Sequence, residues 1–192
     1  GGMLLAMGIC AALVESSKSG KGQVIDAAMT DGSALLMTMM YGMLSAGQWK
    51  DQRDSNLLDG AAHFYGCYEC KDNKYISIGS IEPQFYASLI KCMELDETTF
   101  YNQFDQKQWP ELKKLVSERF KTRTRDEWCE IFMGKDVCFA PVLSLQESVN
   151  YEHNQDRQTF VEIAGINQPA PAPRFSRTES EVKHPPLKVG SN

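Results

Sequence analysis

The sequence is short of the residues and motifs that mark most recognisable catalytic and nucleic-acid-binding proteins. Its 20 lysines and arginines are outnumbered by 25 aspartates and glutamates, so the net charge is −5, and the charges are mixed without a basic stripe. A nucleic-acid partner is therefore not expected. The three histidines are scattered, and the motifs G-x-G-x-x-G, G-x-S-x-G and H-E-x-x-H are absent. These absences exclude the familiar dinucleotide-binding, hydrolase and metalloprotease patterns.

Cysteines lack the arrangement that a disulfide scaffold or a zinc site would need. Six cysteines in 192 residues do not make a scaffold, so reduced thiols in an intracellular protein are the expectation. Cys67 and Cys70 form one C-x-x-C pair. A structural zinc site would need a second pair at similar spacing, and the sequence has none. We therefore expect no metal site.

The apolar stretch near the N-terminus, residues 3–14, is too short to cross a bilayer. No basic residue precedes it and no clear cleavage site follows it, so it does not match a secretory signal. We expect no membrane partner. A chain that opens on Gly-Gly-Met within a helix that should be buried is more simply interpreted as part of a longer protein.

The composition does provide enough apolar material for one or two globular domains, with 42% hydrophobic and 23% charged residues. Residues 3–17 predict a largely buried helix. The segment GQVIDAAM predicts a short strand centred on Val24 and Ile25. A second apolar helix, SALLMTMMYGMLSAG, is expected to start near Asp31. This helix–strand–helix order favours part of an α/β layer.

A polar, turn-rich stretch at residues 47–60 predicts a linker into a second unit. There, HFYGCYECKDNKYISIGS predicts a β-hairpin with its turn near residues 71–73. Three helices are expected to follow, at 84–94, 109–121 and 124–133. Thr124 and Glu127 have the spacing of a capping box that would start the third of these helices.

The C-terminal part of the chain predicts a mixture of short and extended elements. The segment VCFAPVLS predicts a buried strand, and residues 144–150 predict a short helix started by Ser144. From Asn167 onward the chain is expected to be extended, with QPAPAPRF near polyproline geometry. The residues alone favour a surface connector for this tail.

Methionines are concentrated near the second apolar helix. Five of the nine lie between positions 29 and 43: Met29, Met37, Met39, Met40 and Met43. Flexible, polarizable methionine side chains suit surfaces that adapt to varied apolar ligands. Ordinary core packing is the other interpretation, and the residues alone favour it.

The segment GSIEPQFY places a lone carboxylate, Glu82, between an expected strand and an expected helix. An acid at a helix start is stabilised by the helix dipole, by a fraction of a kcal/mol. A carboxylate in a strand-to-helix loop is also well placed to act as an acid, a base or an orienting group at the edge of a cleft. The residues alone favour the first interpretation and leave the second open.

Several segments together show a family resemblance. SGKGQVIDAAMTDGSA, LLDGAAHFYGCYECKDNKYISIGSIEPQFY, DEWCEIFMGKDVCFAPVLSLQE and PAPAPRFSRT resemble, in this order, the family III (CaiB/BaiF-type) CoA-transferases, and within that family its racemase branch. The resemblance runs along nearly the whole chain. IEPQFY and DVCFAPVL are its more specific parts.

The resemblance implies an α/β fold in which a small α+β domain is inserted into a Rossmann-like large domain. Residues 1–27 would be a remnant of the large domain and 28–62 a linker helix and loop. Residues 63–150 would be the small α+β domain, and 151–192 a return linker towards the large domain. Family members form interlocked homodimers, so a homodimer is implied for the full-length protein.

The resemblance also implies a reaction and a set of site residues. Racemases of the family invert C2 of 2-methyl-branched acyl-CoA thioesters through an enolate, with acyl-CoA as substrate and no cofactor. A histidine and an aspartate exchange the proton, and the glutamate at the position of Glu82 hydrogen-bonds the histidine. Met29 matches a position near the acyl chain, and Leu58 and Tyr65 match positions near the thioester. The catalytic histidine and aspartate would lie before residue 1, so the chain by itself is expected to be inactive.

Two other functions stay open at this point. One is a CoA-transferase of the same family, in which the aspartate forms a mixed anhydride. Such transferases often carry a glycine-rich loop near the position of Glu82, and GSIEPQFY is not such a loop, which favours the racemase. The other is a non-catalytic fragment or interaction module. The resemblance places the protein in the peroxisome, the mitochondrion or the cytoplasm.

Overall fold

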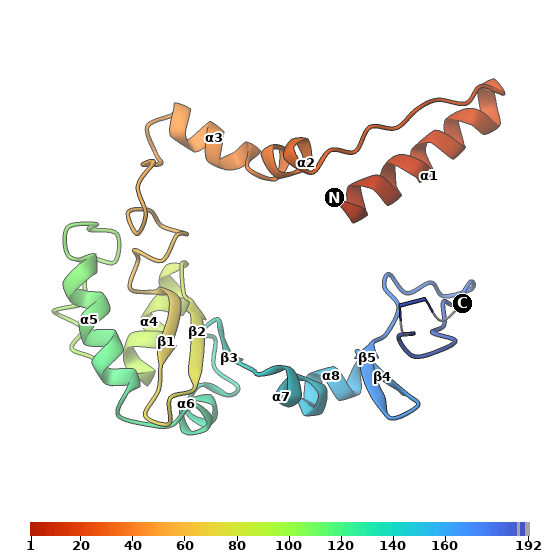
Figure 1. The fold of residues 1–192 in the computed structure, drawn as a ribbon. Helices are drawn as coiled ribbons and strands as arrows, with labels where there is room; N and C mark the ends of the chain where they lie inside the picture. The colour runs from red at the N-terminus through yellow and green to blue at the C-terminus, as the bar shows by residue number, and fades with distance from the viewer. Residues whose placement is uncertain (188, 191–192) are drawn as a thin grey trace. The chain divides into compact units, whose positions relative to one another are not determined.

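A computed structural model describes residues 1–187 and 189–190 and divides the chain into two compact units. The first unit comprises Gly1–Ala62 and the second His63–Asn192 (Figure 1). The boundary between them follows the polar, turn-rich stretch that the sequence analysis interprets as a linker. Each unit has its own secondary structure and is described separately.

The first unit contains three helices, and its longest is not buried as expected. The helix α1, Gly2–Ser19, ends at Gly20, whose φ of 69° places it in the left-handed region and whose N–H donates to the Ser16 carbonyl. No residue of α1 is buried, and the Met3 side chain is 90% exposed. The apolar sequence of α1 predicts that its side chains are buried against another element, but no element of this unit buries them.

The predicted strand at Val24 and Ile25 is also wrong. Residues 20–28 form no strand, and Val24 is 94% exposed, because no second strand in this unit offers a ladder. The segment instead runs along α1 and leads into α2, Met29–Leu36. A Cβ on Gly32 would lie 2.8 Å from Leu4 Cδ1, so α2 packs closely on α1 at this glycine, and a larger residue would require the Leu4 side chain to move.

The helix α3, Thr38–Ser45, continues α2 after an irregular residue, Met37. The sequence predicts one helix that starts near Asp31, whereas the structure begins it at Met29 and divides it in two at Met37. The methionines here are not core residues of the unit, which corrects the favoured interpretation. Met29 is 75% exposed, and Met37 and Met39 are about half exposed.

The second unit is built on a three-stranded antiparallel sheet in the order β1-β2-β3. The strands β1, Tyr65–Glu69, and β2, Tyr75–Gly79, form the predicted hairpin, whose turn contains Asn73 in the left-handed region. The strand β3, Phe139–Val142, pairs with the other edge of β2. All four residues of β3 are exposed or half-buried, so the expectation of a buried strand is wrong, since β3 is an edge strand.

Three helices follow the hairpin, as predicted: α4, Pro83–Cys92, α5, Trp109–Phe120, and α6, Arg125–Phe132. The capping box that starts α6 is confirmed, because Thr124 accepts from the Glu127 N–H and Glu127 accepts from the Thr124 N–H. The helix α5 packs on β1, and α6 packs on β3. The core of the unit is mainly aromatic and aliphatic, and its largest fully buried side chains include Trp128, Phe64, Phe120, Phe132, Ile76 and Leu89.

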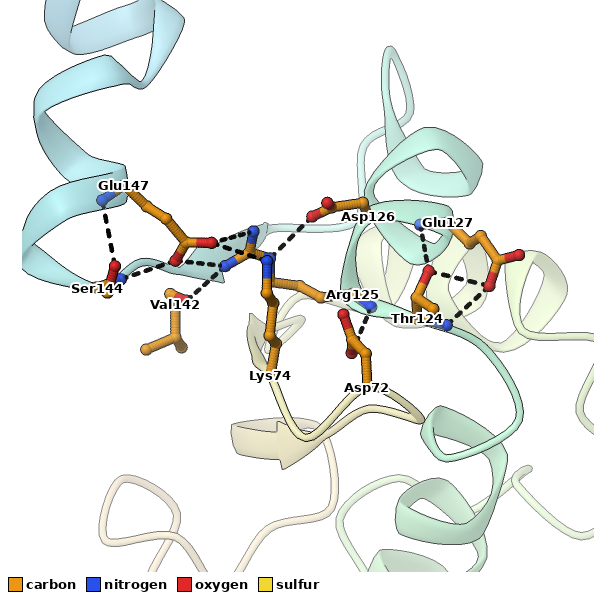
Figure 2. A network of polar contacts seen from close by, with 9 residues as sticks. All are labelled: Asp72, Lys74, Thr124, Arg125, Asp126, Glu127, Val142, Ser144 and Glu147. Atoms are coloured by element: carbon orange, nitrogen blue, oxygen red, sulfur yellow. Dashed lines mark hydrogen bonds and ion pairs between the residues drawn. The ribbon is translucent and has the colours of Figure 1, made fainter.

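An ion-pair network centred on buried Arg125 connects α6 to the chain after the sheet (Figure 2). The Arg125 side chain, only 6% exposed, donates from both terminal nitrogens to the Glu147 carboxylate at 3.0 Å. Its Nε donates to Asp126 at 2.9 Å, and Nη1 also donates to the Val142 carbonyl at 3.1 Å. Lys74 of the hairpin turn donates to Glu147 at 2.9 Å. The network therefore joins the hairpin, α6, β3 and α7, Leu145–Asn150.

The chain after β3 contains more regular structure than expected. The helix α7 begins after Ser144, which forms the predicted cap, with Glu147 completing the capping box. The helix α8, Glu152–Asp156, and a hairpin of β4, Phe160–Ile163, and β5, Ile166–Pro169, were not predicted. The turn of this hairpin is Ala164 and Gly165, both with positive φ, and the sequence signal for it is an apolar strand followed by a small residue and glycine.

Candidate functional site

Glu82 stands at the junction of β2 and α4, where it is the last non-helical residue before Pro83. Proline is favoured in the first helical turn because its missing N–H would be unpaired there in any case. The Glu82 side chain is exposed and makes no capping hydrogen bond. What remains of the helix-start interpretation is the attraction between the carboxylate and the helix dipole, about 0.3–1 kcal/mol. The carboxylate oxygens stay available to an external donor.

The backbone that leads to Glu82 is fixed by buried hydrogen bonds on both sides. The Gly79 N–H donates to the Cys138 carbonyl at 2.8 Å, and the Ser80 N–H donates to the Phe64 carbonyl at 3.0 Å. The buried Ser80 hydroxyl donates to the Val137 carbonyl. Three bonds thus hold two consecutive residues at the end of β2, so the direction in which the chain enters α4 is set by the core.

Gln103 completes this support from the loop between α4 and α5. Its buried side-chain amide donates to the carbonyls of both Ser80, at 3.0 Å, and Ile81, at 2.9 Å. The Gln103 carbonyl in turn accepts from the Trp109 indole N–H at 2.8 Å. The two residues directly before Glu82 are therefore bound to one rigid side chain, which makes Gln103 a positioning residue.

We expect Gln103→Met to lower the free energy of unfolding by about 2 kcal/mol, because two buried carbonyls lose their donor while the side-chain length is kept. Urea unfolding followed by far-ultraviolet circular dichroism measures the change. Gln106→Met, at an exposed position of the same loop, is the matched control and should change stability by less than about 0.5 kcal/mol. Equal unfolding midpoints for the two variants would contradict the role of Gln103.

His63 and Tyr86 anchor the first turn of α4 from inside the core. The Tyr86 hydroxyl donates to the Phe100 carbonyl at 3.0 Å, so it accepts from His63 Nε2 at 2.7 Å, which places the histidine proton on Nε2. His63 is fully buried, and burial lowers its pKa to about 4. Its Nδ1 has no hydrogen-bond partner within the described part of the chain. A buried neutral ring of this kind supports α4 rather than exchanging protons with a ligand.

Tyr65 lies at the same end of the sheet as Glu82. It is paired with Gly79 across the β1–β2 ladder, and its ring would contact a Cβ placed on Gly79 at 3.5 Å. Cys138 is also close to this edge, since the pKa of its thiol is raised by burial and further by the charge of Glu82. The structure thus brings Tyr65 and Glu82 to one edge of the second unit.

Met29 and Leu58 belong to the first unit, and their relation to Glu82 stays a prediction. Met29 begins α2 and is largely exposed. Leu58 lies half-buried in a loop that is stabilised by buried Asn56. The Asn56 side chain accepts from the Lys50 N–H at 2.8 Å and donates to Asp59 at 2.7 Å, so this loop has a fixed shape.

Two classes of site are absent from the described residues. No group of histidine, cysteine, aspartate and glutamate side chains in residues 1–187 and 189–190 is arranged to hold a metal ion. No helix in the same ranges is both long and apolar enough to cross a membrane.

Comparison with known proteins identifies the family of the chain. The sequence profile of CoA-transferase family III matches residues 1–192. The chain belongs to CoA-transferase family III. It is 41% identical over 179 residues to alpha-methylacyl-CoA racemase of Mus musculus and 40% identical over 179 residues to that of Homo sapiens, each comparison covering 93% of this chain.

The family fold is confirmed by solved structures. A CaiB/BaiF family protein from Brucella suis superposes with a TM-score of 0.71 over 97% of this chain and 50% of its own, at 20% identity. The mixed α/β architecture expected from the sequence is therefore correct. The chain spans about half the length of the family relatives it matches, since 47% of each racemase is covered.

The residues that hold the backbone before Glu82 and the first turn of α4 carry no signal in the sequence that could be recognised. Gln103 carries no local signal, because it lies in an irregular loop and acts on carbonyls more than 20 positions away. Tyr86 is part of the IEPQFY segment, but its bond to His63 becomes visible only when the helix is folded against the hairpin. Glu82 itself stood out because a carboxylate between a strand and Pro83 is an unusual local pattern.

Proposed function

We propose that the protein containing these residues is a racemase that inverts C2 of 2-methyl-branched acyl-CoA thioesters. The observation that carries the proposal is the 41% identity to alpha-methylacyl-CoA racemase across 93% of the chain. The position of Glu82, exposed and unbonded at the end of a rigid strand, supports it. Acyl-CoA is the substrate, and no cofactor takes part in the reaction.

The reaction requires two groups that exchange one proton. A base removes the proton from C2, and the electron pair of the broken C–H bond moves into the thioester to form an enolate. An acid then returns a proton to the opposite face of C2, so the configuration inverts without net change in composition. Because the C2 proton is weakly acidic, the base needs a tuned pKa and the enolate oxygen needs electrostatic support.

In this proposal Glu82 is a positioning residue that accepts a hydrogen bond from a catalytic histidine. Such a bond fixes the tautomer of the histidine and raises its basicity. His63 does not serve as this base, because its ring is fully buried and bonded to Tyr86. The catalytic histidine and aspartate are supplied from outside the 192 residues, so the isolated chain does not racemise acyl-CoA.

The family resemblance suggests three further roles in binding the substrate. We assign Tyr65 of the second unit, and likewise Leu58 of the first unit, to contacts with the thioester part of the substrate, and exposed Met29 of the first unit to contacts with the acyl chain. A flexible thioether at the surface can follow acyl chains of different shape. The full-length protein is proposed to be an interlocked homodimer within the cell, in which the apolar surface of α1 to α3 is covered.

Deuterium exchange tests the reaction. The full-length protein is incubated in deuterated water with one epimer of a 2-methylacyl-CoA. We expect deuterium at C2 together with loss of stereochemical purity. Transfer of CoA to an added carboxylate without exchange would instead identify a CoA-transferase, which the family membership makes the second candidate. If the protein shows neither deuterium exchange nor CoA transfer, a non-catalytic interaction module is the remaining interpretation.

Replacing Glu82 with glutamine tests its assigned role in the full-length enzyme. We expect the exchange rate to fall by about 100-fold, because the orientation and basicity of the histidine are lost while an isosteric side chain remains. The pH profile of kcat should also shift, which a merely structural change would not cause. Glu97→Gln, at an exposed site in the same unit, should retain the wild-type rate. An unchanged rate in Glu82→Gln would refute the positioning role.

A further inference from the structure

A concave site that does not include Glu82 lies between α4 and α6 of the second unit. It is open to solvent on one side and has a volume of about 500 Å³, which is typical of small-molecule pockets. We call it the α4–α6 pocket. The residues that line it come from one face of α4, from the turn before α6 and from the end of α6: Ser88, Lys91, Cys92, Glu94, Arg123, Ile131 and Lys135.

The charge of this pocket is opposite to that of the whole chain. Three cations line it, whereas the net charge of the chain is −5. Within the described residues, Lys91 and Lys135 take part in no ion pair. Glu94, the one carboxylate in the lining, is engaged by Arg119, which donates to it and to the Met93 carbonyl. The positive charge that faces the pocket is therefore not neutralised by its own walls.

Arg123 is held in place before any ligand arrives. Its carbonyl accepts from the Lys71 N–H at 2.9 Å, which fixes the backbone. Its guanidinium lies 5.7 Å from the centre of the Trp128 ring. Trp128 is fully buried and donates from its indole to the Phe120 carbonyl at 2.8 Å. A cation held over an aromatic ring by a cation–π contact loses less conformational entropy on binding an anion than a freely moving one.

The remaining lining groups match the same type of ligand. Ser88 and Lys91 lie one turn apart on α4, so a hydroxyl and an ammonium group point to the same side of the helix. Ile131 contributes an apolar wall. Three cationic side chains and one hydroxyl group, all of them hydrogen-bond donors, can bind one or two phosphate groups.

We propose that the α4–α6 pocket binds a small phosphate-bearing anion of the size of diphosphate. The ligand is either a free inorganic anion or the phosphate part of a nucleotide, and the shared chemistry is the phosphate group. The inference rests on the pocket alone and is independent of the racemase reaction.

Isothermal titration calorimetry with inorganic diphosphate at low ionic strength tests the site. We expect saturable binding with one site per chain. The variants Lys91→Gln and Arg123→Gln should each weaken binding about tenfold, the effect of losing one charge-assisted contact worth about 1.4 kcal/mol. Lys114→Gln removes the same charge from an exposed position of α5 and should bind like the wild type.

Tryptophan fluorescence is an independent measurement of where diphosphate binds. Because the Arg123 guanidinium lies within cation–π distance of the Trp128 ring, diphosphate should change the emission of the wild type and leave that of Arg123→Gln unchanged. Adenosine 3′,5′-bisphosphate is titrated in parallel. Tighter binding of this nucleotide than of diphosphate identifies a nucleotide ligand, and equal or weaker binding identifies an inorganic anion.

Two results would overturn the proposal. One is the absence of saturable binding of diphosphate at 10-fold lower ionic strength than physiological. The other is an equal loss of affinity for diphosphate in Lys114→Gln and Lys91→Gln. Such a result would show that binding depends on the overall charge of the chain and not on the α4–α6 pocket. Lys91→Gln and Lys114→Gln are at exposed positions and should leave the unfolding midpoint nearly unchanged. Arg123→Gln removes the half-buried cation over Trp128 and should lower the unfolding midpoint slightly, so circular dichroism verifies that each variant is folded under the conditions of the titration.

Discussion

Replacing Arg125 with alanine is expected to lower the free energy of unfolding of the second unit by about 3 kcal/mol. The guanidinium is almost fully buried and donates to two carboxylates and one carbonyl (Figure 2). Removing it leaves the Val142 carbonyl without this donor and deprives Glu147 of its bidentate partner. The pKa of Glu147 lies well below its usual range because Arg125 and then Lys74 hydrogen-bond to it, so Arg125→Ala removes the largest cause of this lowering and leaves Lys74 as the remaining cation that bonds the carboxylate.

Urea unfolding of the wild type and three variants measures this effect. Arg125→Lys retains the charge but not the fork of donors, and an intermediate loss is expected. Lys121→Ala breaks an exposed pair with Glu118, joined at 3.7 Å, and should cost less than about 0.5 kcal/mol. If Arg125→Ala and Lys121→Ala shifted the midpoint equally, the network would have no special role in stability.

A second large effect is expected from acidification. His63 has a pKa lowered from 6.5 to about 4 by burial, so below pH 6.5 the unfolded chain binds a proton that the folded chain does not. The stability that depends on a neutral His63 is complete above pH 6.5 and is lost progressively as the pH falls towards 4. The full difference amounts to about 3 kcal/mol.

The variant His63→Leu isolates this contribution. It removes the titrating ring and the unpartnered Nδ1, while Tyr86 keeps its bond to the Phe100 carbonyl. We expect the unfolding free energy of His63→Leu to fall about 3 kcal/mol less than that of the wild type between pH 7 and pH 4. His63→Gln, which retains a donor towards Tyr86, should show the same flattened profile.

The exposed His153 provides the control for the acid titration. His153→Gln should keep the wild-type pH profile, so that the difference is assigned to the buried ring and not to histidine content. Parallel profiles of the wild type and both His63 variants would show that His63 does not couple folding to pH.

Features that arise from local sequence could be predicted, and features that depend on a distant partner could not. The hairpin at 65–79 and the capping boxes of Thr124 and Ser144 follow from turn residues and fixed spacings within a few positions. The strand expected at Val24 failed because a strand forms only against another strand. The expected burial of α1 failed for a related reason, since its apolar residues do not determine what covers them.

The candidate site divides in the same way. Glu82 could be singled out because the pattern of strand end, acid and proline is contained in five residues, from Gly79 to Pro83. The family resemblance then gave it a chemical meaning that physical patterns did not supply. Gln103 and the His63–Tyr86 pair could not be found, because hydrogen bonds across more than 20 positions leave no periodic trace in the sequence.

The strand order has a consequence for synthesis of the protein. The central strand β2 finishes at Gly79, but its second partner starts at Phe139, about 60 residues later. At roughly 5–20 residues per second, a ribosome needs about 3 to 12 seconds to deliver β3. During that interval the nascent chain presents an unpaired strand edge, a surface on which a second nascent chain can pair. The ion-pair network closes later still, since Glu147 follows β3 in the chain.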